Sequence, residues 1–143
     1  MGRYTLRRRI PASPERVYRA FTDPVLAADW LDVSGIVQQR GPLDAAGTTY
    51  TLVIRGPWRF RSVVVRADPP RLHETAGRAP LGGAFRMVAR LNPVDGGTDL
   101  ELLTEYTVPL GAIGRWVDRR WIEPGPRTGA NREVDRLVEI VSA

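Results

Sequence analysis

The sequence predicts an α+β fold in which an antiparallel sheet of seven strands packs against a long C-terminal helix. Three observations indicate this. Helical patterning is confined to residues 13–31 and to the region after Pro109. Residues 34–107 instead alternate with a period of two, and turn sequences such as "RGP", "DPP" and "DGG" divide them into short segments. A chain of 143 residues holds one core, so we expect a single domain over residues 1–143.

The N-terminal region predicts one strand followed by two short helices. "RYTLRRRI" alternates and ends before Pro11, as a strand does. "SPE" at residues 13–15 combines a capping hydroxyl, a proline at the first helical position and an acid in the first turn, and "DP" at residues 23–24 repeats this start signal. Apolar pairs four residues apart give each helix a buried face: Val17 with Phe21, and Leu26 with Trp30.

The middle of the chain predicts six further strands. Each is a run of alternating or β-branched residues between turn sequences. Their boundaries are placed to about two to four residues. The expected spans are 34–40, 48–55, 58–68, 71–78, 83–92 and 98–107.

The C-terminal region is helical in pattern but contains helix breakers. Ile113, Val117 and Trp121 are spaced by four, and an amphipathic stripe resumes at residues 134–141 with Val134, Leu137, Val138 and Val141. Between them stands "EPGPRTG", and a proline inside a helix costs about 3 kcal/mol. We therefore expect a break or kink over residues 124–129. The break is either a loop that joins two helices, or a functional feature that opens the mouth of a cavity or allows an oligomer contact.

The dipeptide Asp95-Gly96 predicts a two-residue hairpin turn. Val94 then faces Gly97, and the numbers of opposed residues sum to 191. One face carries Arg86 opposite Glu105 and Arg90 opposite Glu101, and the other collects Leu91 with Leu100, Ala89 with Leu102, Met87 with Thr104, and Phe85 with Tyr106. We expect the arginines to be ion-paired on the outer surface, at about 0–1 kcal/mol each, and the inner face to carry function.

Composition excludes several classes of function. All 21 basic residues are arginine and the formal net charge is +5, yet a nucleic-acid role requires unpaired, clustered arginines, contrary to the hairpin register. The absence of cysteine and the presence of one histidine argue against disulfides, thiolate chemistry and common zinc sites. No phosphate-binding loop, dinucleotide fingerprint or nucleophile elbow occurs. We expect no metal, no cofactor, no nucleic acid, no integral membrane contact and a cytoplasmic location.

Three stretches together resemble a known superfamily. They are "IPASPERVYRAFTDPVLAADWL", "ADPPRLHETAG" and "GGTDLELLTEYTVPLGAIGRWVDR". In this order the chain is similar to the START-like, helix-grip (SRPBCC) superfamily, and more narrowly to its polyketide cyclase/dehydrase and lipid-transport branch. The resemblance implies a curved sheet around a C-terminal helix with a hydrophobic cavity between them. It implies no catalytic residues, because no catalytic motif of the family is matched.

The leading hypothesis is a protein, monomer or homodimer, that binds a hydrophobic small molecule without catalysis. The alternatives are a polyketide cyclase/dehydrase and a protein-interaction module of the chaperone-activator type. His73 and Tyr106 are the candidate catalytic groups, although a surface or structural histidine is the simpler interpretation, and the pattern does not say which face His73 occupies. The predicted cavity residues are Trp30, Tyr50, Leu52, Trp58, Phe60, Phe85, Met87, Leu102, Thr104, Tyr106 and Trp116.

Overall fold

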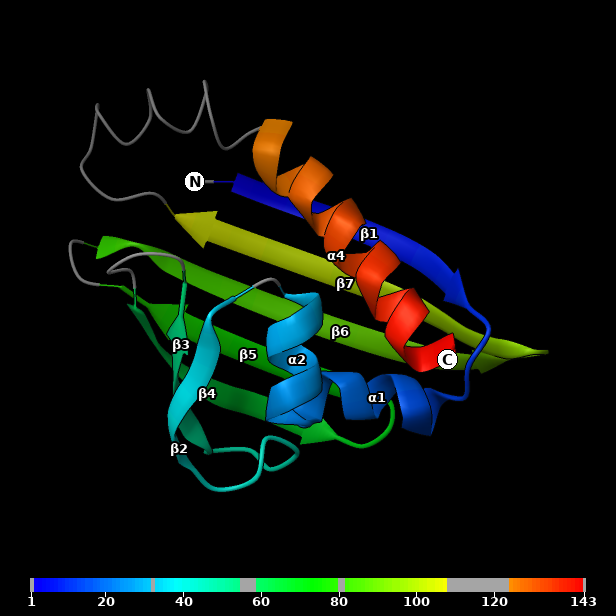
Figure 1. The fold of residues 1–143 in the computed structure, drawn as a ribbon, viewed down its shortest axis with the longest axis horizontal. Helices are drawn as coiled ribbons and strands as arrows, with labels where there is room; N and C mark the ends of the chain where they lie inside the picture. Colours follow the sequence, from blue (N-terminus) through cyan, green and yellow to red (C-terminus); the bar gives the residue numbers. More distant parts are fainter. Residues whose placement is uncertain (1, 32, 55–58, 80–81, 108–123, 143) are drawn as a thin grey trace.

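A computed structural model describes residues 2–31, 33–54, 59–79, 82–107 and 124–142 (Figure 1). The expected fold and element order are confirmed, and every strand begins and ends within two residues of its expected limits. The sheet has seven antiparallel strands in the order β1-β7-β6-β5-β4-β3-β2, so the first and last strands are neighbours. The elements are β1 (Gly2–Ile10), α1 (Pro14–Thr22), α2 (Pro24–Trp30), β2 (Gly35–Arg40), β3 (Thr49–Val53), β4 (Arg59–Asp68), β5 (Leu72–Arg78), β6 (Ala84–Val94), β7 (Gly97–Thr107) and α4 (Pro124–Ser142).

Both N-terminal helices begin where the capping signals predict. The Ser13 hydroxyl accepts a hydrogen bond from the Arg16 amide at 3.3 Å and caps α1. The Asp23 carboxylate accepts from the Val25 and Leu26 amides at 2.9 and 3.3 Å and caps α2. These side chains satisfy amides that have no acceptor within their own helix.

Of the alternatives expected for the break or kink at residues 124–129, the loop is wrong, because these residues are helical. Helix α4 is continuous from Pro124 to Ser142, so the motif forms the start of the helix rather than an interruption. Proline is tolerated there because the first four amides of a helix have no intrahelical acceptor, and Pro124 and Pro126 stand at the first and third helical positions. The expected helical stretch containing Ile113, Val117 and Trp121 lies outside the described residues.

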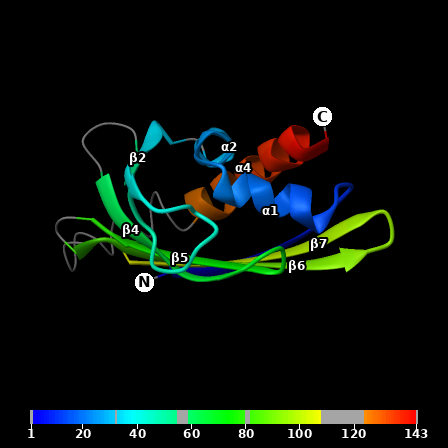
Figure 2. The same cartoon turned by 90° about the horizontal axis from the view of Figure 1, so that it is seen from below.

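The sheet is a curved layer with all described helices on its concave side (Figure 2). Two apolar clusters lie on that side. The larger joins the three described helices to β1, β6 and β7, and includes Ile10, Trp30, Leu91, Leu102 and Leu137. The smaller lies over β3 and β4 and is built on Leu43, Tyr50, Leu52 and Val64. The concave face is therefore apolar in two separate regions.

Helix α4 is held in place by its apolar stripe and by ion pairs. Val134 and Leu137 are fully buried in the larger cluster, as their spacing predicts. Arg136 pairs with Asp29 of α2 at 3.0 Å, and Arg8 of β1 pairs with Asp135 at 2.6 Å. The buried stripe supplies most of the attachment, because exposed ion pairs contribute only about 0–1 kcal/mol each.

The predicted hairpin register is confirmed in full, from Val94 opposite Gly97 to Phe85 opposite Tyr106. Gly96 in the turn has a φ of 78°, a conformation that glycine adopts readily. Arg86 and Glu105 form the expected ion pair at 3.3 Å. The expected partner of Arg90 is wrong, because Glu101 pairs with Arg7 of β1 at 2.7 Å. The hairpin pattern omits the neighbouring strand that supplies this arginine.

Candidate ligand-binding face

Cross-strand register brings hydroxyl groups from strands far apart in sequence onto one region of the concave face. Side chains two apart on a strand share a face, and directly opposed residues on neighbouring strands lie side by side. One row across the sheet runs from β1 to β5 through Tyr4, Thr104, Met87 and Thr75. Hydroxyl-bearing side chains therefore flank a central methionine.

The next row lies one step nearer the end of the sheet where β1 begins and β7 ends. It crosses six strands and contains Gly2, Tyr106, Phe85, Gly77, Ser62 and Tyr50. Together the two rows contribute six hydroxyl groups, which we call the hydroxyl wall: Tyr4, Tyr50, Ser62, Thr75, Thr104 and Tyr106.

Two glycines in the second row make room for the aromatic rings of their neighbours. A Cβ atom on Gly77 would collide with the ring of Phe85, and a Cβ atom on Gly2 would collide with the ring of Tyr106. Both rings therefore lie over glycine backbone. The Phe85 ring also packs edge-on against Phe60, with 5.5 Å between the centroids. In this row, therefore, each of the two glycines leaves space for the large side chain beside it.

The hydroxyl wall contains one buried polar atom without a partner. Thr104 Oγ1 is buried and has no hydrogen-bond partner among the described residues. Burial raises the pKa of Tyr4, and the Thr104 hydroxyl lowers it in part. The two hydroxyls are therefore close without meeting hydrogen-bond geometry. A buried hydroxyl left without a partner costs free energy, so this position favours an occupant that supplies one.

The hydroxyls at the other end of the wall lie close to one another. Burial raises the pKa of Tyr50, and the Thr75 and Ser62 hydroxyls oppose part of that rise. Ser62 donates a hydrogen bond to the Phe60 carbonyl at 3.2 Å. The Ser62 donor is therefore satisfied, whereas the Thr104 hydroxyl has no partner among the described residues.

His73 faces inward but lies outside the hydroxyl wall. It is opposite Ala89 in an adjacent, more apolar row, and its ring packs edge-on against Tyr18 of α1 at 5.6 Å. Nε2 lies 2.8 Å from the Leu43 carbonyl, which can only accept, so Nε2 carries the proton. Burial lowers the pKa of His73. The structural role that the sequence favoured fits this position.

The structure brings most of the predicted cavity residues to the concave side of the sheet. Tyr50, Thr104 and Tyr106 belong to the hydroxyl wall, and Met87 and Phe85 lie within its rows. Trp30 instead packs on Phe21, and its indole N–H donates to the Ala20 carbonyl at 2.8 Å. The remaining predicted residues have different outcomes: Leu52 and Phe60 lie in the smaller cluster, Leu102 lies in the larger one, and Trp58 and Trp116 lie outside the described residues.

Sequence reasoning missed Tyr4, Ser62 and Thr75. Alternation within "RYTLRRRI" groups Tyr4 with Leu6, and Thr75 has the same parity as His73, so the pattern held a signal. What it lacked was the pairing of β1 with β7, which places Tyr4 beside Thr104.

Two further properties bear on the kind of site. Within the described part of the chain, no three His, Cys, Asp or Glu side chains gather in a way that could hold a metal ion. The described helices include none that is both long and apolar enough to cross a membrane.

A curved antiparallel sheet with a C-terminal helix on its concave side defines the helix-grip class of proteins. The chain belongs to the polyketide cyclase/dehydrase and lipid transport family, whose pattern matches residues 1–141. No curated protein sequence matches it.

Solved structures share the fold at low sequence identity. Protein MLL2253 from Mesorhizobium loti is 18% identical with a TM-score of 0.76, and the match covers 99% of this chain and 97% of that one. Protein CV1439 from Chromobacterium violaceum is 24% identical with a TM-score of 0.73, at 99% and 97% coverage. SA2116 from Staphylococcus aureus, a protein of unknown function, is 12% identical with a TM-score of 0.77, at 99% and 93% coverage. At these identities the likeness establishes the fold alone.

Proposed function

We propose that the protein binds a small hydrophobic ligand, such as a lipid, an isoprenoid or a polyketide-like molecule, against the hydroxyl wall and beneath α4, without catalysing a reaction. The buried, unpartnered hydroxyl of Thr104 carries this proposal. A ligand with an apolar body and one or two oxygen atoms covers Met87 and Phe85 and pairs with Thr104. The proposal includes a cytoplasmic location and a monomeric or homodimeric state.

The electrostatics of the described residues favour binding over catalysis. His73 is committed to the Leu43 carbonyl, and burial keeps its neutral form dominant. Burial raises the pKa of Tyr4 and of Tyr50, so both hydroxyls stay protonated at neutral pH and do not act as bases. These hydroxyls can donate hydrogen bonds to a carbonyl oxygen, which is a recognition role.

An interaction module is less well supported. Such a role favours a contiguous exposed apolar patch. The large apolar side chains exposed in the described part of the chain are Val25, Val37, Val65 and Val94, and they belong to four different elements. Single exposed valines are ordinary on protein surfaces.

The proposal is tested with methyl-labelled methionine. The chain contains two methionines, and Met87 lies inside the wall, so the variant Met87→Leu assigns its signal. Palmitate, farnesol and emodin serve as lipid, isoprenoid and polyketide probes. We expect at least one to shift the Met87 signal saturably, and Thr104→Val to weaken that shift. Failure of all three probes to shift the Met87 signal, or an equal shift in Thr104→Val, contradicts the proposal.

A further inference from the structure

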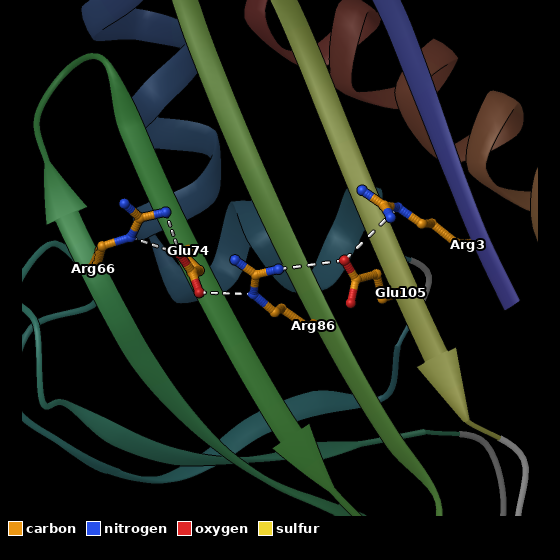
Figure 3. A network of polar contacts seen from close by, with 5 residues as sticks. All are labelled: Arg3, Arg66, Glu74, Arg86 and Glu105. Atoms are coloured by element: carbon orange, nitrogen blue, oxygen red, sulfur yellow. Dashed lines mark hydrogen bonds and ion pairs between the residues drawn. The ribbon is translucent and has the colours of Figure 1, made fainter. Parts of the chain in front are cut away.

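The convex face of the sheet carries two kinds of arginine. The first kind is neutralised. Figure 3 shows a belt of ion pairs on the face turned away from the helices, running from Arg66 through Glu74, Arg86 and Glu105 to Arg3. Ion pairs of 3.3 Å or less join the side chains of β4, β5, β6 and β7, which are four of the five strands that the belt crosses. The acids of this belt are therefore already engaged.

The second kind is not neutralised. Arg59 and Arg61 on β4 and Arg78 on β5 are exposed, and none of them forms an ion pair or hydrogen bond with the described residues. The sequence segments between the neighbouring strands, residues 55–58 and 80–81, contain no acid. Three positive charges therefore lie close together, and the carboxylates of the neighbouring ion-pair belt are already paired with other arginines.

The pairing of β4 with β5 makes this arrangement of arginines unfavourable when no anion is bound. Arg61 lies directly opposite Arg78, and like charges in opposed positions destabilise a sheet. Arg59 follows on the same face of the same strand, about 7 Å away along it. A bound anion removes this repulsion, and guanidinium groups match the geometry of an oxyanion.

The three arginines line a half-open hollow. Its volume is about 1010 Å³, and its lining combines the arginines with the small residues Ala76, Ala79 and Ala84. Ala84, Arg78, Arg61 and Thr51 form one continuous row across four strands of the convex face. The alanines leave the room that larger side chains would fill. This volume is close to that of small-molecule sites, roughly 300–1,000 Å³.

A strained residue adds hydrogen-bond donors to the same hollow. Gln38 lines it with a φ of 53°, a left-handed conformation that is unfavourable for a residue other than glycine. Gln38 Oε1 accepts a hydrogen bond from Thr51 at 2.8 Å, so the side-chain NH₂ remains as a donor. The charged groups in the described lining are all arginines, and the neutral amide of Gln38 adds a hydrogen-bond donor.

We propose that this arginine hollow binds the phosphate group of a small organic phosphate. A charge of about −2 suits three arginines better than a single carboxylate does. The apolar body of such a ligand lies against Val63 and the alanines. The three arginines lie on the face opposite the hydroxyl wall, so the proposal stands independently of the proposed function. Three arginines in one hollow are also too compact a patch for a nucleic-acid track.

The test is calorimetric titration with phenyl phosphate at constant ionic strength, with phenol as the neutral comparator. The variant R61Q/R78Q removes two charges from the hollow. The control R7Q/R90Q removes two charges from the same face outside it. We expect saturable binding of phenyl phosphate but not phenol. R61Q/R78Q weakens it by at least about tenfold, and the control changes it less than about twofold.

A second readout does not depend on the ligand titration. Because R61Q/R78Q relieves the opposed charges, we expect its melting temperature without phosphate to be no lower than that of the wild type. Inorganic phosphate then raises the melting temperature of the wild type and not of the variant. The single variants R61Q and R78Q repeat the comparison with half the change in charge.

Several results overturn the proposal. They are equal losses of binding in R61Q/R78Q and R7Q/R90Q, equal binding of phenol, and no saturable binding of phenyl phosphate by the wild type. Phosphatidylcholine vesicles with and without phosphatidic acid separate the two sources of phosphate. Binding only to the phosphatidic acid vesicles means a membrane surface instead of a soluble ligand. Binding only to a single-stranded oligonucleotide indicates a nucleic-acid surface and likewise contradicts the assignment.

Discussion

Replacing Thr104 with valine is expected to stabilise the empty protein and weaken ligand binding. Valine keeps the β-branched shape of threonine and removes only the hydroxyl. That hydroxyl is buried and has no partner among the described residues, and in proteins such a group costs roughly 1–3 kcal/mol. Thr104 itself is 8% exposed, and Tyr4 lies nearby, so the lower end applies. We expect a gain of about 1 kcal/mol, which corresponds to ~2–4 °C in melting temperature at this chain length.

The assay is urea unfolding followed by tryptophan fluorescence, with the midpoint and slope compared between variants. Thr5→Val is the matched control, because Thr5 lies on the same sheet but is exposed on the convex face. Its free energy of unfolding should change by less than about 0.5 kcal/mol. A loss of about 1 kcal/mol or more in Thr104→Val refutes the reasoning, because it means that the hydroxyl already has a partner in the empty protein.

Three other variants test the structural account. Glu74→Gln lowers the free energy of unfolding by about 1–3 kcal/mol at neutral pH, since Arg66 and Arg86 outweigh the effect of burial and hold the pKa of Glu74 below its usual value. The contribution of Glu74 to stability is present above its unfolded pKa and is lost as pH falls through its folded pKa. The free energy of unfolding of Glu74→Gln therefore falls less steeply than that of the wild type as the solution is acidified. Equal stability of variant and wild type at neutral pH contradicts the expectation. Because burial lowers the pKa of His73, protonation of its ring favours the unfolded chain. The free energy of unfolding of the wild type therefore falls as pH drops below about 6.5, and that of His73→Gln falls less. Curves of unfolding free energy against pH that run parallel for the two proteins contradict this expectation. Pro126→Ala changes the free energy of unfolding by at most about 1 kcal/mol because its position needs no amide donor, and a larger gain in helix stability contradicts that placement.

Local sequence signals predicted a large part of the fold. The capping residues Ser13 and Asp23 predicted two helix starts, and Asp95-Gly96 predicted the register of an entire hairpin. These signals act between residues close in sequence, where geometry leaves few alternatives. The motif at residues 124–129 was misread because proline opens a helix as readily as it breaks one, and position within the helix decides which.

The candidate sites needed information that no local pattern contains. The hydroxyl wall exists because β1 pairs with β7, so Tyr4 meets Thr104 across the length of the chain. Because of the same pairing, Glu101 forms its ion pair with Arg7 instead of with Arg90, which was its expected partner. The arginine hollow likewise depends on the pairing of β4 with β5, which places Arg61 opposite Arg78. Alternation within β4 groups only Arg59 with Arg61.

Native mass spectrometry of freshly purified protein, followed by organic extraction, tests the central claim most directly. If the concave face binds a hydrophobic molecule, the spectrum shows a stoichiometric apolar adduct that extraction releases. Thr104→Val then carries less of it than Thr5→Val. A protein that is empty, and whose melting temperature no lipid, isoprenoid or polyketide probe raises, contradicts the claim.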